Sequence, residues 1–175
     1  MILYSQTNGV LLEDILNLDE MGVQVIPPRS LAIRGSKQVG SAKKAVAQIT
    51  KTSLCNVKGE MLGFQLIFSG KTDAVHPKNV KLPSNCLFSH SPSHFANVTT
   101  LAEFINHTII SYIIATRKWR VDAGASTQEE EDMRWAVLVM DNFSVHRDES
   151  IQALLRQHRI DPKCVSTSLS NQSYQ

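Results

Sequence analysis

Residues 135–150 read WAVLVMDNFSVHRDES, and in this stretch five apolar residues, Ala136 to Met140, lead directly into Asp141. A run this rich in valine and leucine, followed by turn-forming residues, predicts a buried strand that ends at the aspartate. Burying an ionised carboxylate costs several kcal/mol of folding free energy unless another group pairs with it. We therefore expect a partner for the Asp141 carboxylate at the end of this strand.

A second apolar run also ends in an acid. In DILNLDEMGVQVIP, residues 14–27, the strand expected over Ile15 to Leu18 is followed by Asp19, and 141 − 19 = 122 residues separate the two aspartates. If the two strands are neighbours in one sheet, both carboxylates project from the same end, where their repulsion favours a shared divalent cation. Mg²⁺ and Mn²⁺ suit such oxygen ligands. The alternative is that each acid is only a turn former or a helix cap.

Apolar patterns predict two further strands, in AVAQITKTSLCNV (45–57) and MLGFQLIFSGKT (61–72), joined by a short turn at Gly59 and Glu60. This arrangement is typical of a β-hairpin, and the strand before it extends the hairpin to an antiparallel meander. The next stretch, residues 73–97, contains three prolines and has no regular period. We expect a long irregular connection there, with one short strand at most.

The clearest helix covers residues 101–113, where one face of a 3.6-residue period is apolar: Leu101, Phe104, Ile105, Ile109, Tyr112 and Ile113. We expect a polar, exposed insertion over residues 117–134, in which the acidic run TQEEEDM (127–133) is a solvated loop. A second helix follows Asp148, a suitable N-cap, and IDPKCVS (160–166) starts a last strand.

The element order is three strands, a helix, a strand, a helix and a strand. A meander followed by βαβ elements indicates an α/β protein with a mixed sheet and helices packed on it. We expect one domain over residues 11–165 and a disordered tail over residues 166–175.

Composition narrows the class of protein. Apolar residues make up 42% of the chain and charged residues 19%, as in a soluble globular domain. No stretch reaches the roughly 18 consecutive apolar residues of a membrane span, so no membrane partner is expected. The three cysteines are far apart and form no CxxC pair. Neither a zinc site nor a disulfide framework is therefore expected, and a reducing intracellular compartment fits best.

Positive charge is concentrated in one part of the chain. Between Val23 and Gly59 there is no acidic residue, and seven basic residues occur: Arg29, Arg34, Lys37, Lys43, Lys44, Lys51 and Lys58. A surface of one sign attracts polyanions, nucleic acid above all. DNA is the expected partner, and no small-molecule substrate is expected. The alternative is a surface that is basic but only solvated.

Three segments resemble the catalytic core of DDE/D transposases of the pogo and mariner kind, a domain that also occurs in host proteins similar to jerky and centromere protein B. The segments are ILNLDEMGV (15–23), GSKQVGSAKKAVAQITKTSLCNVKGEMLGFQLIFSGKT (35–72) and VLVMDNFSVHRDESIQALLRQHRI (137–160). Asp19 matches the family motif of the first catalytic aspartate, and Asp141 matches that of the second. The resemblance covers nearly all of residues 11–165.

This resemblance implies an RNase H-like fold, in agreement with the element order, and metal-dependent cutting and joining of DNA in the nucleus. Asp19 and Asp141 would be the catalytic and metal-binding residues, with Mg²⁺ or Mn²⁺ as the cofactor. His146, Asn142 and Ser144 lie just past the second aspartate, where they would order the loop or touch phosphate.

The family also needs a third carboxylate, which follows the second within a proline-rich segment. Residues 165–175, VSTSLSNQSYQ, contain neither an acid nor a proline, and Asp161 is the only acid after Glu149. We therefore expect a truncated, C-terminally incomplete domain in which metal and DNA binding persist and catalysis does not. Two alternatives stay open: a domesticated fragment that binds DNA or chromatin without metal, and an unrelated α/β interaction domain.

Overall fold

Six strands form one mixed sheet in the order β4-β3-β2-β1-β5-β6, in a computed structural model that describes residues 9–25 and 47–165. The strands are β1 (Ile15–Val25), β2 (Ala47–Asn56), β3 (Met61–Ser69), β4 (Cys86–Ser91), β5 (Ala136–Asp141) and β6 (Ile160–Val165). The α-helices are α2 (Val98–Phe104), α3 (Ser111–Asp122), α4 (Gln128–Met133) and α5 (Glu149–Gln157). A π-helical segment, η3 (Ile105–Ile110), joins α2 to α3, and short 3-10 turns occur at η1 (Leu12–Asp14), η2 (Asp73–Val75) and η4 (Val145–Arg147). The expected α/β class with a mixed sheet is confirmed.

The first three strands form the predicted antiparallel meander. β1 pairs with β2, and β2 pairs with β3. Gly59 has a φ of 85° in the turn between β2 and β3, a backbone conformation that glycine adopts without strain. Past β3, the proline-containing stretch holds one strand, β4, which runs parallel to β3 at the edge of the sheet.

The strand that ends at Asp141 lies beside the strand that contains Asp19, as predicted. β1 and β5 are parallel, with Ile15 opposite Val137 and Asn17 opposite Val139. Leu16 and Leu138 alternate with these residues and belong to the main core. The two strands therefore share one face in the main core. On the opposite face, Ile15 and Val137 form a small second buried cluster with Val10.

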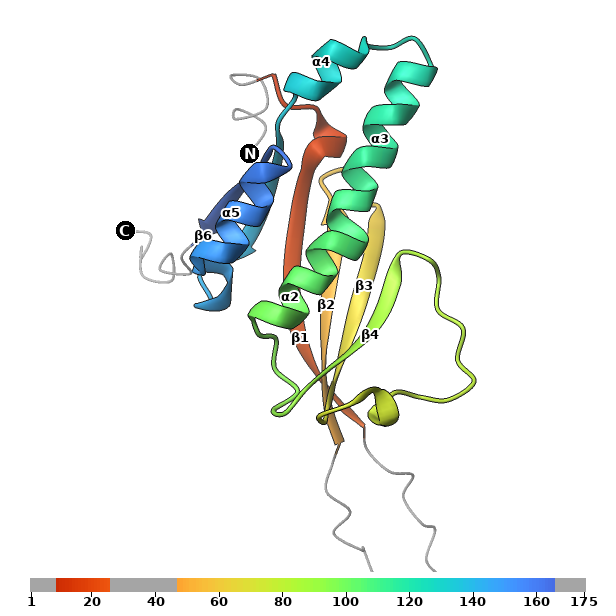
Figure 1. Cartoon of the computed structure of the whole chain (residues 1–175), viewed down its shortest axis with the longest axis vertical. Helices are drawn as coiled ribbons and strands as arrows, with labels where there is room; N and C mark the ends of the chain where they lie inside the picture. Colours follow the sequence, from red (N-terminus) through yellow and green to blue (C-terminus); the bar gives the residue numbers. More distant parts are fainter. Residues whose placement is uncertain (1–8, 26–46, 166–175) are drawn as a thin grey trace, which may run out of the picture.

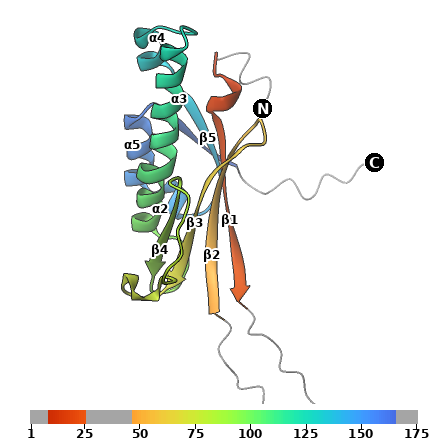
Figure 2. The ribbon, with the colours of Figure 1, turned by 90° about the vertical axis from the view of Figure 1, so that its right-hand side faces the viewer.

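Helices α2, α3 and α5 all pack on the same face of the sheet (Figure 1 and Figure 2). Residues from the helices and from the even-numbered positions of β1, β2 and β5 fill the space between the layers, and the largest of them, including Phe104, Ile109, Leu18 and Met140, are almost completely buried. Within the described residues, no helix covers the other face of the sheet. Asp19 and Asp141 are both exposed.

The long helical run Val98–Asp122 is the core helix. Asn97 caps it in a capping box with Thr100, and the predicted apolar face is buried at Leu101, Phe104, Ile105, Ile109 and Ile113. By length and composition alone this run would suit a membrane span, the one such helix among the described residues. Its apolar face packs on the sheet, which accounts for its composition.

The acidic run after this helix forms a helix, not the expected loop. Glu129, Glu130 and Asp132 are exposed as expected, but Glu131 is not. α3 continues to Asp122, and Thr127 then begins α4 with a capping box that includes Glu130. Glu131 in α4 is buried, and its Oε2 lies 2.7 Å from Nη2 of Arg120. The prediction failed because burial of Glu131 depends on a cation supplied by another helix.

Candidate metal and nucleic-acid site

Asp19 and Asp141 come from the adjacent parallel strands β1 and β5. The paired register of these strands ends at Asn17 and Val139, and each aspartate lies two residues further along its own strand. Strand alternation alone would send both side chains to one face of the sheet. Both residues are exposed. The Asp141 carboxylate lies against His146, whose other ring nitrogen faces Glu20, and Asp141 and Glu20 line one pocket. The fold therefore sets the two strands that carry the aspartates side by side, and a metal shared by the two carboxylates stays a prediction.

The turn after β5 holds one oxygen of Asp141. Asp141 Oδ1 accepts a hydrogen bond from the backbone N–H of Phe143 (3.3 Å) and lies 2.7 Å from Nδ1 of His146. Asp141 Oδ2 has no such partner among the described residues, and the side chain is 57% exposed. The protein thus orients the carboxylate through one oxygen and leaves the other available to a ligand.

His146 lies buried in η4, with a side chain only 2% exposed, between two acids. Its Nδ1 is 3.2 Å from the carbonyl oxygen of Asp141, and its Nε2 is 3.5 Å from Oε1 of Glu20. The second distance is long for a hydrogen bond. Both Nε2 and Glu20 Oε1 are buried and lack a hydrogen-bond partner within residues 9–25 and 47–165, so they interact as charges.

Burial of the imidazole lowers the pKa of His146, but its interactions with Glu20 and Asp141 outweigh this and leave the pKa above its ordinary value. A protonated ring suits a position between two carboxylates. The neutral ring would leave the partly buried Glu20 without a compensating charge. His146 therefore acts as a local counter-ion that orients Asp141.

The Asp19 carboxylate, like that of Asp141, is hydrogen-bonded through one oxygen. Its Oδ1 accepts a hydrogen bond from the backbone N–H of Glu20 (2.9 Å), and Oδ2 has no hydrogen-bond partner among the described residues. Carboxylate oxygens are the ligands that Mg²⁺ and Mn²⁺ prefer, and each aspartate has one oxygen without a hydrogen-bond partner among the described residues. A divalent cation at these two residues stays a prediction.

A shallow pocket of about 320 Å³ opens beside Asp141. Glu20, Thr50 and Asp141 contribute polar groups to it, and the aromatic rings of Phe95 and Phe143 line it as well. Both phenylalanines are exposed. Exposed aromatic rings can stack on a nucleic-acid base, since every base has an aromatic face.

The predicted DNA-binding residues are only partly placed. Lys51 in β2 lies two residues from Ser53, the partner of Asp19, so it shares the face of the aspartates. Its Nζ is 5.5 Å from the centroid of the Phe64 ring. The His146 ring is buried and contacts Asp141. A contact of His146 with phosphate stays a prediction. Five predicted residues lie outside the described residues: Arg29, Arg34, Lys37, Lys43 and Lys44.

Sequence reasoning missed Glu20. It follows Asp19 directly, and strand alternation sends its side chain to the opposite face, toward His146. The signal was present in the period-two pattern, because Glu20 continues the buried series of Leu16 and Leu18. An acid at a core-facing position predicts a buried cationic partner.

Solved structures are similar to this chain in fold. The crystal structure of the catalytic domain of Mos1 mariner transposase has a TM-score of 0.50 at 11% sequence identity, and the match covers 96% of this chain and 57% of that chain. The Mos1 mariner paired end complex with Mn has a TM-score of 0.47 at 12% identity and covers 92% of this chain and 38% of that chain. No protein-family model matches the sequence, and no curated protein matches it.

The likeness to the Mos1 catalytic domain confirms the RNase H-like sheet that the sequence resemblance implied. This chain spans 57% of that domain's length. At 11% identity the likeness shows the fold alone. What the protein does has to be inferred from the chemistry of its own residues.

Proposed function

We propose that residues 11–165 form a DDE/D transposase-derived, nucleic-acid-binding domain in which Asp19 and Asp141 hold a divalent cation. The observation that carries this proposal is the parallel pairing of β1 with β5, the two strands that contain the aspartates. The RNase H-like fold shared with the Mos1 catalytic domain supports it.

The residues of the site have different roles in this proposal. Asp19 and Asp141 would each offer one oxygen to Mg²⁺ or Mn²⁺, and the bound ion would act as a Lewis acid toward a phosphate oxygen of DNA. His146 holds the other oxygen of Asp141 and is a positioning residue. Asn142 and Ser144, exposed directly after Asp141, would donate hydrogen bonds to phosphate.

Strand cleavage is not part of the proposed function. A two-metal clamp on the scissile phosphate needs more acidic ligands than two aspartates. Among the described acids after Asp141, Asp148 caps α5. Asp161 in β6 pairs with Val137, which lies four residues before Asp141 in β5. Glu20 is close, but its carboxylate interacts with His146. We expect metal and DNA binding without nicking.

DNA binding through the basic stretch, residues 29–58, is proposed to be weak, salt-sensitive and independent of sequence. Each phosphate contact contributes about −0.9 to the slope of log K against log salt. In gel shifts, Lys43→Glu with Lys44→Glu should weaken binding and flatten this slope by up to about 1.8. Lys78→Glu with Lys81→Glu makes the same change of charge at exposed lysines outside the stretch and should change the slope less. Equal effects of the two double variants would contradict the proposal.

A domesticated DNA- or chromatin-binding module without metal chemistry is the second candidate, because the basic stretch needs no metal to bind phosphate. The same gel shifts separate the two candidates. If the metal site is used, Asp141→Asn lowers DNA affinity in Mn²⁺ buffer and not in EDTA. A metal-free module binds DNA equally in both buffers. Either function would be carried out in the nucleus.

A further inference from the structure

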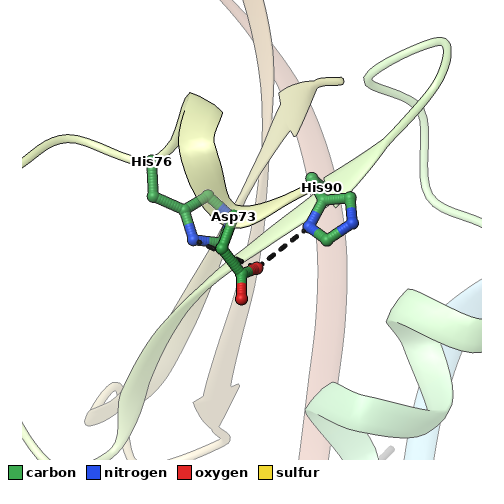
Figure 3. A group of neighbouring side chains, drawn as sticks. All are labelled: Asp73, His76 and His90. Carbon is green, nitrogen blue, oxygen red and sulfur yellow. Dashed lines mark ion pairs between the residues drawn. The ribbon is translucent and has the colours of Figure 1, made fainter. Parts of the chain in front are cut away.

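We propose that Asp73, His76 and His90 form a binding site for a transition-metal cation, Zn²⁺ in preference to Mg²⁺. Both imidazoles point at one oxygen of the Asp73 carboxylate (Figure 3). His76 Nδ1 lies 3.6 Å from Asp73 Oδ1, and His90 Nδ1 lies 3.2 Å from the same oxygen. One ligand atom from each residue lies within 4.8 Å of the other two.

Local backbone structure brings these side chains together. Asp73 and His76 stand at the two ends of the 3-10 turn η2, which is closed by a hydrogen bond of 3.0 Å from the His76 N–H to the Asp73 carbonyl. Side chains three residues apart in such a turn lie on the same side. His90 lies on β4 opposite Phe68 of β3. The site therefore joins the start of the β3–β4 loop to the edge strand.

The separations suit a small tetrahedral ion. Bonds of about 2.0–2.1 Å to imidazole nitrogen and carboxylate oxygen place neighbouring ligand atoms roughly 3.3–3.4 Å apart. The two measured nitrogen–oxygen separations lie on either side of this value. Two imidazoles and one carboxylate leave the fourth position to water. Imidazole ligands suit zinc and its neighbours, whereas Mg²⁺ prefers oxygen.

The two imidazoles are largely fixed before any ion binds. The side chains of His76 and His90 are 17% and 31% exposed, while that of Asp73 is 83% exposed. Phe68 and Phe88 each pack against the His76 ring with centroids 5.7 Å apart. His76 Nε2 is buried and has no hydrogen-bond partner among the described residues, so Nδ1 is the ring atom that His76 turns toward a polar group. An ion could approach from the side of the exposed carboxylate.

Our expectation that the chain has no zinc site rested on its cysteines, and this cluster uses none of them. It is also independent of the proposed function, because two strands, β3 and β2, separate β4 from the strand of Asp19. A bound ion would link the loop after β3 to β4 and stabilise the folded state, since it binds only when the three residues are held together.

The test is a Co²⁺ titration of the full chain after removal of metal with a chelator, because tetrahedral Co²⁺ absorbs strongly in the visible range. We expect one such site per chain, from which Zn²⁺ displaces Co²⁺. Asp73→Asn removes a ligand at an exposed position, and His90→Ala removes another. Each should weaken binding at least about tenfold. His107→Ala, at an exposed histidine of the core helix, should bind as tightly as the wild type.

Absence of the tetrahedral Co²⁺ spectrum in the wild type, or an affinity unchanged by Asp73→Asn, would overturn this proposal and leave a hydrogen-bonded cluster only. Circular dichroism of the metal-free variants checks that they are folded. If His90→Ala does not fold, the exposed Asp73→Asn variant decides the result alone.

Discussion

Arg120 is the residue that lets this chain bury acids far from the candidate site. Its Nη2 lies 3.0 Å from Oδ2 of Asp14 and 2.7 Å from Oε2 of Glu131, and all three residues are buried. Burial raises the pKa of Asp14 although Arg120 opposes this effect. Burial also acts to raise the pKa of Glu131, but hydrogen bonds led by that from Arg120 leave it lowered. One guanidinium thus ties η1 to α3 and α4.

Replacing Arg120 with alanine should lower the free energy of unfolding by about 3–5 kcal/mol, because buried carboxylates would lose their cation. The matched control is Lys118→Ala on the same helix, whose exposed ion pair with Asp122 has a distance of 2.9 Å. Such a pair contributes only about 0.3–0.5 kcal/mol. Urea unfolding of the two variants measures the difference. Similar losses in both would show that the buried network adds no more than a surface pair.

His146 should make stability depend on pH. Its folded pKa is raised, so the stabilisation from its protonated ring is fully present below its unfolded pKa of about 6.5 and is lost as pH rises through the folded pKa. His146→Gln should therefore destabilise the protein more at about pH 6 than at about pH 9. His107→Gln, an exposed histidine, is the control. A difference between wild type and His146→Gln that stays constant with pH would contradict the counter-ion role.

At the scale of elements, Gly63 allows β3 to approach both the loop that precedes β4 and the core helix. Pairing along β3 passes from Gly63 opposite Leu54 to Met61 opposite Cys55, which is a β-bulge. A Cβ added at Gly63 would lie 2.2 Å from the carbonyl oxygen of Asn85 and 2.6 Å from Cγ2 of Thr108. The absence of a side chain is therefore needed for this packing.

Gly63→Ala should lower the free energy of unfolding by about 1–3 kcal/mol, the usual result of overpacking a core. Gly22 in β1 is the matched strand glycine, because a Cβ there meets no atom within 4 Å. Gly22→Ala should be close to neutral. Denaturant midpoints of the two variants test this, and a Gly63→Ala protein as stable as Gly22→Ala would mean that the backbone moves apart at little cost.

Elements with a regular local pattern were predictable from the sequence, and elements fixed by distant partners were not. The core helix followed from its 3.6-residue period, and Asp148 caps α5 as predicted. β4 was not located, because prolines interrupt its surroundings and its pairing with β3 is parallel and non-local. α4 was missed because the sequence around Glu131 does not show that Arg120, from another helix, pairs with this acid and allows it to be buried.

At the scale of the whole molecule, the helices lie on one face of the sheet (Figure 2). Asp19 and Lys51 share the face without a helix in the described part of the chain. The pairing of the two aspartate-containing strands was predictable from their apolar runs. Only β5 ends at its aspartate as expected, because β1 continues to Val25 and Asp19 lies within it. The contact of His146 with Glu20 was not predictable, since the two residues are 126 positions apart in the sequence and the parallel pairing of β1 with β5 brings them together.

Whether Asp19 and Asp141 hold a divalent cation is answered by a Mn²⁺ titration of the isotope-labelled chain, followed by paramagnetic broadening of its amide signals. We expect a single weak site that broadens the signals of Asp19, Asp141 and Asn142 first, because two carboxylates leave most of the metal coordination to water. Broadening there should disappear in Asp141→Asn and persist in Asp122→Asn, an exposed acid on α3. Signals around His90 are evaluated separately, because Mn²⁺ at the proposed site of Asp73, His76 and His90 would broaden them too. Broadening around Asp19 that is absent in the wild type, or that survives Asp141→Asn unchanged, would contradict the shared metal site.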